Sequence, residues 1–356
     1  MRLCRAAGPG PRGCGSVAEV LPAMVLAAGL GTRLRPLTFE LPKPMVPLLD
    51  RPAMAHTVDL LHHHGIDRIV ANLHYFPDTI RDYFGDELTY VQEEELLGTA
   101  GGVRNAKDFF GGEPFLVLSG DALTDLDVKK LVERHEKSGG VATLCVRRVT
   151  DTTQYGVVLT DDEGRITGFQ EKPDPAEALS DLANCGMYVF SPEIFDYFPD
   201  TDFVDWAEDV FPTLLENDVP FHVYEMDEYW NDVGALDELR NGTFDALSGE
   251  LRLEALPDAG PEAIMVGPGS SLDNASLVEG PVWVGRDVEI ASGVRLQGPL
   301  VLGDGVTVGE GAAIKRSIVL PGTEIQAHTI LIEAITGSTG IVSSLRPRDD
   351  TRLSAS

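Results

Sequence analysis

A six-residue repeat in the C-terminal third of the chain constrains its fold most. Apolar residues recur at every sixth position in two series offset by two residues, one from Val282 to Ile318 and one from Val266 to Leu320. Such hexapeptide periodicity indicates a parallel β-helix, in which each hexad supplies one short strand to one face of the coil. The run holds about nine hexads, so we expect roughly three coils of three hexads each.

The sequence before the repeat alternates apolar strands with amphipathic helices. Buried strands of a parallel sheet are predicted over residues 25–28, 68–73, 115–119 and 141–146. Helices are predicted over residues 54–64 and 127–137, and a β-hairpin over residues 155–171. This pattern predicts a doubly wound, Rossmann-like α/β domain, whose ligands bind at the carboxyl ends of the strands.

The chain is accordingly divided into four parts. Residues 1–23 are rich in Gly and Pro, lack the apolar core of a signal peptide, and are predicted to be a disordered extension. The α/β domain is predicted to span residues 24–250 and the β-helix residues 251–335, followed by a polar, frayed tail over residues 336–356.

A glycine-rich turn followed by cations points to an anionic ligand. The apolar segment that starts at Met24 continues into Gly29-Leu-Gly31-Thr32, and Arg33, Arg35 and Lys43 come soon after. Glycine permits positive φ and close approach, so such a turn can present backbone N–H groups to a phosphate. The chain contains no Gly-Lys-Ser/Thr, which excludes a P-loop, and Leu34 stands where a dinucleotide fingerprint needs its third glycine.

This segment, Leu26-Ala-Ala-Gly-Leu-Gly-Thr-Arg-Leu-Arg-Pro-Leu-Thr38 with Pro42-Lys-Pro44, resembles the opening of the sugar-1-phosphate nucleotidylyltransferases, and the likeness extends to about residue 335. The family joins a nucleoside triphosphate to a sugar 1-phosphate and releases pyrophosphate. The resemblance implies a left-handed coil for the β-helix and catalytic roles for Arg33 and Lys43. It also implies a nucleotide-binding loop made by Ala27, Ala28, Gly29, Gly31 and Thr32.

Two carboxylates are candidate ligands of Mg²⁺. Asp121 follows the strand over residues 115–119, and Asp232 lies in Trp230-Asn-Asp-Val-Gly234. Mg²⁺ prefers oxygen ligands, commonly one or two carboxylates together with substrate phosphates. The resemblance assigns the metal to Asp121 and Asp232, with Asp125 as a weaker rival.

The sugar phosphate is assigned to the hairpin and to the segment after it. Lys172, in Glu171-Lys-Pro173, can neutralise a phosphate, and Glu171 can accept hydrogen bonds from sugar hydroxyls. By resemblance, Gly156 and Asn184 complete this sugar site, although the family usually has Ala where this chain has Cys185. No residue distinguishes mannose from glucose.

The segment Gln92-Glu-Glu-Glu-Leu-Leu-Gly98-Thr99 is expected to read the base. In uridylyl- and thymidylyltransferases a Gln stands five residues before the glycine, and here that position holds Glu93. A carboxylate only accepts hydrogen bonds, which suits the two adjacent donors of guanine. The run resembles the Glu-Glu-Glu-Pro-Leu-Gly-Thr-Ala-Gly of mannose-1-phosphate guanylyltransferases. A solvated glutamate run and a one-residue shift that places Gln92 at the base stay open as alternatives.

Charge and cysteine usage restrict the partners. The net charge of −29 argues against nucleic acid and anionic membranes. The four cysteines show no metal-ligand spacing and are typical of a cytoplasmic protein. The clustered His62, His63 and His64 are not expected to bind metal, and the apolar residues of 203–215 are expected to belong to the core.

Three functions are compatible with these motifs. The favoured one makes GDP-mannose from GTP and mannose 1-phosphate without a covalent enzyme intermediate. The second uses UTP or dTTP with glucose 1-phosphate, and the third is a non-catalytic regulatory paralogue that binds a nucleotide sugar. Because hexapeptide coils leave open ends and exposed faces, we also expect a homo-oligomer formed through residues 260–335.

Overall fold

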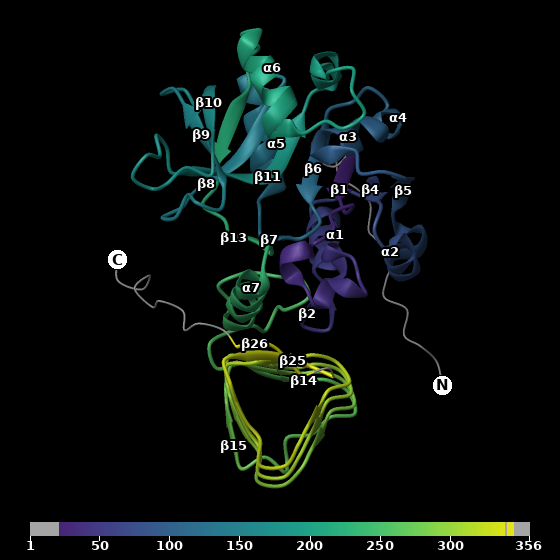
Figure 1. Ribbon diagram of the computed structural model, residues 1–356, viewed down its shortest axis with the longest axis vertical. Helices are drawn as coiled ribbons and strands as arrows, with labels where there is room; N and C mark the ends of the chain where they lie inside the picture. Colours follow the sequence, from purple (N-terminus) through teal and green to yellow (C-terminus); the bar gives the residue numbers. More distant parts are fainter. Residues whose placement is uncertain (1–20, 339, 345–356) are drawn as a thin grey trace, which may run out of the picture.

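A nine-stranded sheet forms the centre of the α/β domain in the computed structural model, which describes residues 21–338 and 340–344 (Figure 1). Seven strands follow one another in the order β10 (Ile166–Glu171), β9 (Gly156–Thr160), β11 (Leu182–Phe190), β6 (Phe115–Ser119), β1 (Ala23–Leu26), β4 (Ile69–Leu73) and β5 (Thr89–Gln92). The remaining two, β8 (Ala142–Arg148) and β12 (His222–Glu225), extend the sheet beside β11.

The sheet is mixed, so the expectation of a parallel sheet was only partly right. β1 lies parallel to both β4 and β6, and β4 is parallel to β5. β11, however, lies between β6 and β8 and is antiparallel to both. A continuous apolar run indicates that a strand is buried on both faces, but it carries no information about the direction of the neighbouring strand.

Helices cover the sheet, and two of them were predicted within one residue at each end. These are α1 (Ala53–His63) and α5 (Val128–Ser138), which is capped by the Asp127 carboxylate accepting from the Lys130 N–H. One side of α5, formed by Val128, Leu131, Val132 and His135, is buried, as expected for an amphipathic helix. The other helices are α2 (Pro77–Phe84), α3 (Gly98–Asn105), α4 (Lys107–Phe110), α6 (Phe211–Glu216) and α7 (Leu236–Ser248).

Two short two-stranded sheets lie at the carboxyl side of the central sheet. One pairs β2 (Pro47–Leu48) with β3 (Arg51–Pro52). The other pairs β7 (Ala122–Thr124) with β13 (Trp230–Asp232) in antiparallel fashion, so that the late segment containing Asp232 returns beside Ala122. This second sheet brings residues distant in sequence to the same edge.

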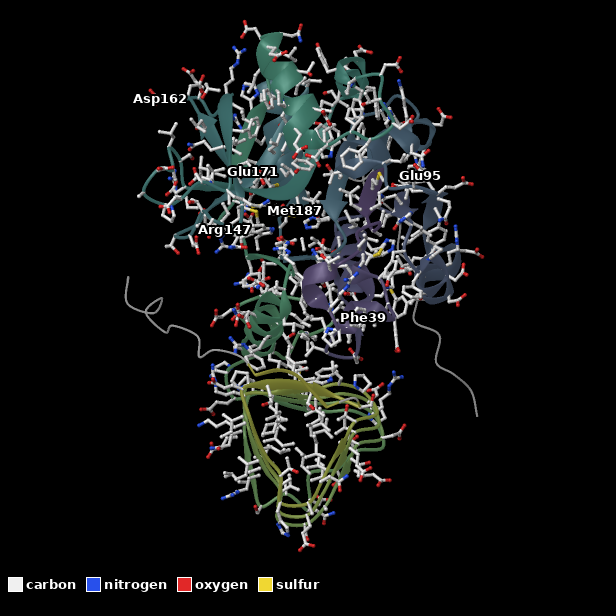
Figure 2. All side chains as sticks on the ribbon, viewed as in Figure 1. Phe39, Glu95, Arg147, Asp162, Glu171 and Met187 are labelled. Atoms are coloured by element: carbon white, nitrogen blue, oxygen red, sulfur yellow. The ribbon has the colours of Figure 1, made fainter. Side chains whose placement is uncertain are left out.

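The C-terminal part is a triangular coil of parallel strands, as the hexapeptide repeat predicted (Figure 1). Its first face contains β14 (Ile264–Val266), β16 (Val282–Val284), β19 (Leu300–Leu302), β22 (Ile318–Val319), β25 (Ala334–Gly337) and β26 (Gly340–Ser344). The second contains β15 (Leu277–Glu279), β18 (Arg295–Gln297), β21 (Ala313–Lys315) and β24 (Ile330–Ile332). The third contains β17 (Glu289–Ile290), β20 (Thr307–Val308) and β23 (Glu324–Ile325). Side chains fill the interior (Figure 2). The left hand of the coil stays a prediction.

The spacing between coils shortens by one residue in the last coil. The six-residue series that ends at Ile318 therefore does not continue into the interior of the coil at that residue. Ile264 pairs with Val282, which pairs with Leu300, so the first coils repeat every 18 residues. Val301 then pairs with Ile318, a repeat of 17. As a result, Ile318 joins the apolar cluster around α7, and its neighbour Val319 takes the interior position.

The ends of the described chain also differ from the expectation. Leu21 is buried in the apolar core and Ala23 begins β1, so the described domain includes residues before Met24. Within the predicted frayed tail, β26 pairs antiparallel with β25. Its sequence, Gly-Ile-Val-Ser-Ser, contains two β-branched residues that favour a strand. The other residues of the predicted extension and tail, 1–20 and 345–356, lie outside the described residues.

One continuous apolar core joins the two parts. α7 lies between the α/β sheet and the coil (Figure 1). Phe244 and Leu247 of this helix pack in the same cluster as Val301 and Ile335 of the coil and Leu34 of the glycine-rich segment. The coil therefore shares one apolar cluster with α7 and with Leu34, which follows the glycine turn. Among the described residues no helix is long and apolar enough to cross a membrane.

A buried histidine makes the stability of the α/β domain depend on pH. Burial lowers the pKa of His135 to about 4, while its ring nitrogens contact the hydroxyls of Thr143 and Ser191 at 3.0 Å. The unfolded chain binds this proton near pH 6.5 and the folded chain does not, so the neutral ring contributes stability above that pH. That contribution decreases as the pH falls from 6.5 towards 4.

We therefore predict that His135→Gln, which cannot be protonated, is less stable than the wild type at pH 7. The difference, of the order of 1–3 kcal/mol, should shrink or reverse by pH 4. Urea unfolding of both proteins across this pH range measures the difference in their free energies of unfolding. Because the carboxylates titrate in both proteins, their contribution cancels in that difference. A difference that stays constant with pH would show that His135 is not buried in its neutral form.

Candidate active site

The glycine-rich turn follows β1 directly and holds one glycine in a conformation that only glycine adopts easily. Gly31 has a φ of 61°, in the left-handed region. A Cβ added to it would lie 2.8 Å from the Cβ of Lys43. Its carbonyl accepts a hydrogen bond from the Thr38 hydroxyl at 2.7 Å. The absence of a side chain at Gly31 thus allows Lys43 to pack against the turn.

Lys43 lies between the two predicted metal ligands. Its Nζ forms an ion pair with Asp121 and lies 3.6 Å from Oδ1 of Asp232. Asp121 immediately follows β6 and Gly120, while Asp232 ends β13; the Val233 N–H donates to the Asp121 carbonyl at 3.3 Å. The structure therefore brings together three residues that are far apart in sequence.

The charges of this group depend on one another. Burial alone would lower the pKa of Lys43, but the nearby carboxylates of Asp121 and Asp232 more than offset it and raise that pKa. Burial, and next the negative charge of Asp121, raise the pKa of Asp232. Two adjacent carboxylates in a partly buried site repel each other, and a nearby cation stabilises them. Lys43 supplies part of that positive charge.

Arg33 contributes a second cation to the same site. A Cβ added to Gly234 would lie 3.0 Å from Nη2 of Arg33, so the guanidinium packs directly over the turn that follows Asp232. Its positive charge acts to lower the pKa of Asp232. Arg33 and Lys43, the two cations predicted to act at the glycine turn, are therefore both next to the paired carboxylates.

A cavity of about 250 Å³ opens beside this group. Of the predicted residues, seven line it: Ala28, Gly29, Lys43, Glu93, Gly98, Thr99 and Asp121. A Cβ added to Gly29 would meet nothing within 4 Å, so this glycine faces open space. Ala27, Gly31, Thr32, Arg33 and Asp232 are not among its lining residues; Ala27 is buried, and Gly31 supports Lys43.

The three adjacent glutamates have different environments. Glu94 and Glu95 are exposed, whereas Glu93 is only 2% exposed and lines the cavity. The Glu93 carboxylate accepts from Asn72 Nδ2 at 2.7 Å and from the Leu97 N–H at 3.1 Å. A solvated run is therefore the right description for two of the three glutamates and wrong for Glu93.

Gln92 is not in the cavity lining. Its side chain is exposed, and its Oε1 accepts a hydrogen bond from Nη2 of Arg81 at 2.9 Å. The structure therefore places the side chains of Gln92 and Glu93 in separate environments, and Glu93 is the one at the cavity.

Gly98 and Thr99 begin α3 against the segment that follows residue 200. Gly98 has a φ of 81°, and a Cβ there would collide with the Val204 carbonyl. The Thr99 hydroxyl donates to the Asp205 carboxylate at 2.7 Å. These contacts hold the loop before α3 and Phe203 together at the rim of the cavity.

The four predicted sugar residues lie on the hairpin side of the domain, outside the lining of this cavity. Gly156 and Glu171 are paired across β9 and β10, and Glu171 lies on that side in Figure 2. Lys172 donates to Glu171 at 2.5 Å, and both are exposed. Asn184 Nδ2 donates to the Tyr188 hydroxyl and its Oδ1 accepts from the Gly186 N–H, each at 3.1 Å.

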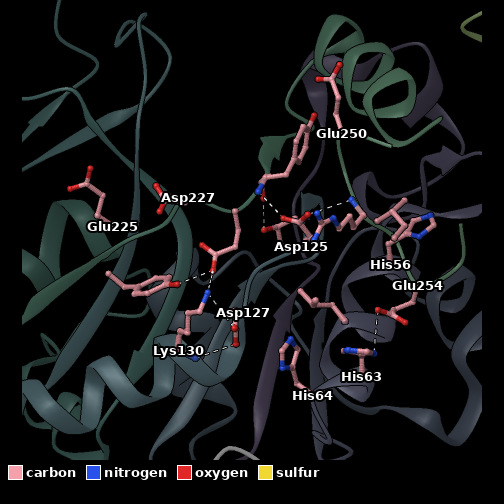
Figure 3. Close-up of a pocket in the computed structure, with 17 residues that line it drawn as sticks. His56, His63, His64, Asp125, Asp127, Lys130, Glu225, Asp227, Glu250 and Glu254 are labelled. Carbon is pink, nitrogen blue, oxygen red and sulfur yellow. Dashed lines mark hydrogen bonds and ion pairs between the residues drawn. The ribbon is translucent and has the colours of Figure 1, made fainter. Parts of the chain in front are cut away.

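Asp125, the rival metal ligand, lines a different pocket from Asp121. Its carboxylate accepts from the backbone N–H groups of Tyr229 and Arg252 and lines a separate, acidic pocket together with His63 and His64 (Figure 3). Within the described residues no cluster of three or more His, Cys, Asp or Glu is suited to a metal. The paired carboxylates of Asp121 and Asp232 around a cation fit Mg²⁺ that takes its other ligands from substrate phosphates.

Six residues of the cavity lining were not assigned to the site from the sequence: Leu26, Pro44, Asn72, Leu96, Ser119 and Phe203. Asn72, at the end of β4, is 3% exposed and reaches the lining from below the glycine turn. Phe203 was assigned to the core but is 55% exposed and also lines the cavity. The neighbouring Trp206 and Phe211 are buried as expected. Phe203 is the first residue of the segment 203–215, and this place at the end of the predicted core segment was the available signal.

The chain matches known proteins over most of its length. A family model described as nucleotidyl transferase matches residues 22–248. The chain belongs to the sugar-1-phosphate nucleotidyltransferase family. It is 38% identical over 301 residues to the UTP–glucose-1-phosphate uridylyltransferase of Synechocystis sp., covering 77% of this chain and 76% of that protein. It is 34% identical over 281 residues to the mannose-1-phosphate guanylyltransferase of Mycobacterium tuberculosis, covering 77% of each.

A relative in Drosophila melanogaster and two solved structures extend the likeness. The mannose-1-phosphate guanylyltransferase catalytic subunit beta of that fly is 35% identical over 326 residues, covering 88% of this chain and 83% of the other. HddC from Yersinia pseudotuberculosis, solved in complex with GMP-PN, aligns with a TM-score of 0.55 and 25% identity, covering 63% of this chain and 98% of its own. A UDP-glucose pyrophosphorylase bound to UDP-glucose shares the fold at a TM-score of 0.56 and 21% identity, covering 63% of this chain and 97% of its own.

The two glycines of the turn make a matched pair for mutation. We predict that Gly31→Ala destabilises the protein by about 1–2 kcal/mol, because of its left-handed backbone, and displaces Lys43. Gly29→Ala should leave stability unchanged but weaken nucleotide binding, because its methyl group would enter the cavity. Thermal unfolding and equilibrium binding of the nucleotide separate the two effects. Equal stability of Gly31→Ala and wild type would contradict the role given to Gly31.

Proposed function

We propose that this enzyme transfers a guanylyl group from GTP to mannose 1-phosphate, giving GDP-mannose and pyrophosphate. The proposal rests on one observation: the only carboxylate at the cavity besides Asp121 is that of Glu93, among the lining residues described. Guanine presents N1–H and the 2-amino group side by side, and a carboxylate accepts from both.

The existing contacts of Glu93 leave room for a base. Each carboxylate oxygen has two lone-pair sites, and within the described part of the chain each accepts one hydrogen bond, from Asn72 or from Leu97. Uracil or thymine would instead turn a carbonyl towards an acceptor, and such a mismatch of buried polar groups costs about 1–3 kcal/mol. The GMP-PN complex of HddC and the guanylyltransferases of M. tuberculosis and D. melanogaster support the same choice of base, and the two enzymes support mannose.

In the proposed mechanism, a phosphate oxygen of the sugar 1-phosphate attacks the α-phosphorus of the nucleotide and pyrophosphate leaves in line. Backbone N–H groups of Gly29–Thr32, with Arg33 and Lys43, bind the triphosphate and the leaving group. Lys172 neutralises and orients the sugar phosphate beside Glu171, with Gly156 and Asn184 on the same side. The chain supplies position and positive charge, and no covalent enzyme intermediate forms. Asp121 and Asp232 would hold Mg²⁺, which would supply charge neutralisation to the phosphates.

A second candidate keeps the chemistry but uses UTP and glucose 1-phosphate. It is favoured by the identity of 38% to the Synechocystis uridylyltransferase. The placement of Gln92 against Arg81 speaks against the version in which Gln92 reads the base. The group formed by Lys43, Asp121 and Asp232 speaks against a purely regulatory paralogue, because binding a finished nucleotide sugar does not require it.

The test measures pyrophosphate release with Mg²⁺, crossing GTP, UTP, dTTP and ATP with mannose and glucose 1-phosphates. We expect kcat/KM for GTP with mannose 1-phosphate to exceed every other pair by at least about tenfold, the value of one mismatched buried hydrogen bond. In Glu93→Gln the preference for GTP over UTP should fall by a similar factor. A wild-type preference for UTP would reject the proposal, and inactivity with all pairs would favour the regulatory paralogue.

We further propose that the chain forms a homo-oligomer through its coil. The outward side chains of β24, Ile330 and Ile332, are 71% and 56% exposed, while the outward residues of the neighbouring β21 are Ala313 and Lys315. Large aliphatic side chains so exposed at the edge of a sheet favour association with another copy.

Replacement of both isoleucines by Glu should therefore convert the oligomer into a monomer without loss of folding. Sedimentation velocity of the wild type and of Ile330→Glu/Ile332→Glu measures this. The matched control is Glu289→Lys, an exposed outward position on another face of the coil. A monomeric wild type would overturn the proposal.

A further inference from the structure

Asn72 connects the two halves of the nucleotide site through its side chain. It lies on β4, level with Leu26 of β1 and Val91 of β5, and is 3% exposed. Its Oδ1 accepts from the Ala27 N–H at 2.8 Å, at the start of the glycine turn. Its Nδ2 donates to Oε1 of Glu93 at 2.7 Å. One buried amide therefore contacts both the phosphate-binding turn and the base-reading carboxylate.

The direction of this amide is fixed by chemistry. The Ala27 N–H can only donate, and the carboxylate of Glu93 can only accept, so only one orientation of the Asn72 amide satisfies both. Asp at this position would offer an acceptor to both neighbours, and Leu would offer neither group. Asparagine matches the two partners without a buried charge of its own.

Residues other than Asn72 also fix the position of Glu93. Its second oxygen accepts from the Leu97 N–H at 3.1 Å, and its backbone N–H donates to the Leu73 carbonyl at 2.8 Å. Gly102 of α3 packs over the pair: a Cβ there would lie 2.7 Å from both Asn72 Nδ2 and Glu93 Oε1. The helix therefore closes over the contact only because this residue is glycine.

We propose that Asn72 is a positioning residue that sets base selectivity by orienting Glu93 and ties that orientation to the glycine turn. The inference rests on the proposed function, in which Glu93 reads the base. A base that fits Glu93 leaves the amide and the Ala27 N–H in place, so the turn is ready for the triphosphate. A base that displaces Glu93 disturbs the turn through Asn72. Selection of the base and binding of phosphate are thereby linked.

The decisive variants exchange donor and acceptor. Asn72→Asp places two carboxylates in contact, so Glu93 should turn away. The KM for the nucleoside triphosphate should rise by at least about tenfold, the effect of losing a charge-assisted hydrogen bond, and the preference between GTP and UTP should fall by a similar factor.

The double variant Asn72→Asp/Glu93→Gln reverses the direction of the bond. The new amide at position 93 donates to the new carboxylate at position 72, and its carbonyl oxygen still accepts from the Leu97 N–H. This variant should recover the KM for the nucleotide but not the base preference, because the side chain that faces the base is no longer a carboxylate.

The readouts separate positioning from a general structural role. Each variant is measured for thermal unfolding, for binding of a fluorescent GTP and a fluorescent UTP, and for the KM of the sugar phosphate, which should change less than about twofold, within the spread of a neutral surface substitution. Asn217→Asp, an exposed position at the end of α6, is the matched control. If the single variants fail to fold, the double variant still tests the proposal, because it restores the hydrogen bond.

Unchanged nucleotide KM and base preference in folded Asn72→Asp would overturn the inference, as would an equal loss of affinity for the sugar phosphate. The proposed function fails separately: a wild type that prefers UTP rejects guanine as the base. In that case, loss of the UTP preference in Asn72→Asp would still support the positioning role of Asn72.

Discussion

The contact of one buried ammonium with two carboxylates holds the active site together. Lys43 comes from the segment after the glycine turn, Asp121 from the end of β6 and Asp232 from β13. The side chains of Asp121 and Lys43 are 13% and 16% exposed, whereas that of Asp232 is 35% exposed. Removing the ammonium would leave Asp121 mostly buried beside a second negative charge, at a cost below the roughly 3–5 kcal/mol typical of a fully buried pair, because solvent screens Asp232. In the proposed function, the same charged groups face the phosphates of the nucleotide. Stability and the proposed activity therefore depend on one electrostatic balance, and local cations offset the net charge of −29 at the site.

The fold supplies the geometry for this balance. Parallel strands β1, β4 and β6 end at one edge, so the glycine turn, Asn72 and Asp121 start from adjacent positions. The small sheet of β7 and β13 returns Asp232 to that edge, and α7 then follows directly. α7, the coil and Leu34 share one apolar cluster. The coil therefore packs, through α7, against the segment that contains the glycine turn. The coil is thus joined to the active site by packing rather than by a flexible linker.

Sequence predicted those features that depend on local chemistry or short periodicity. The glycine turn, the carboxylate after β6 and the hexapeptide coil each have a pattern that one segment carries alone. The direction of β11, the one-residue loss before Ile318 and the exposure of Phe203 depend on neighbours from distant segments, which a single sequence does not contain. Asn72 was missed for the same reason: an isolated polar residue in a buried strand has no local signature, and its meaning comes from Ala27 and Glu93. The separation of Gln92 from Glu93 likewise became visible only with the strand β5 in place.

The measurement that tests the central claim most directly is a double-mutant cycle on the chemical step. Single-turnover rates of pyrophosphate release are compared for the wild type, Lys43→Met, Asp121→Asn and the double variant, each verified as folded by circular dichroism. If the ammonium and the carboxylate act as one unit, each single variant should lose about 10²–10³ in rate and the double variant little more. Rate losses that multiply, or single variants that retain the wild-type rate, would contradict the account.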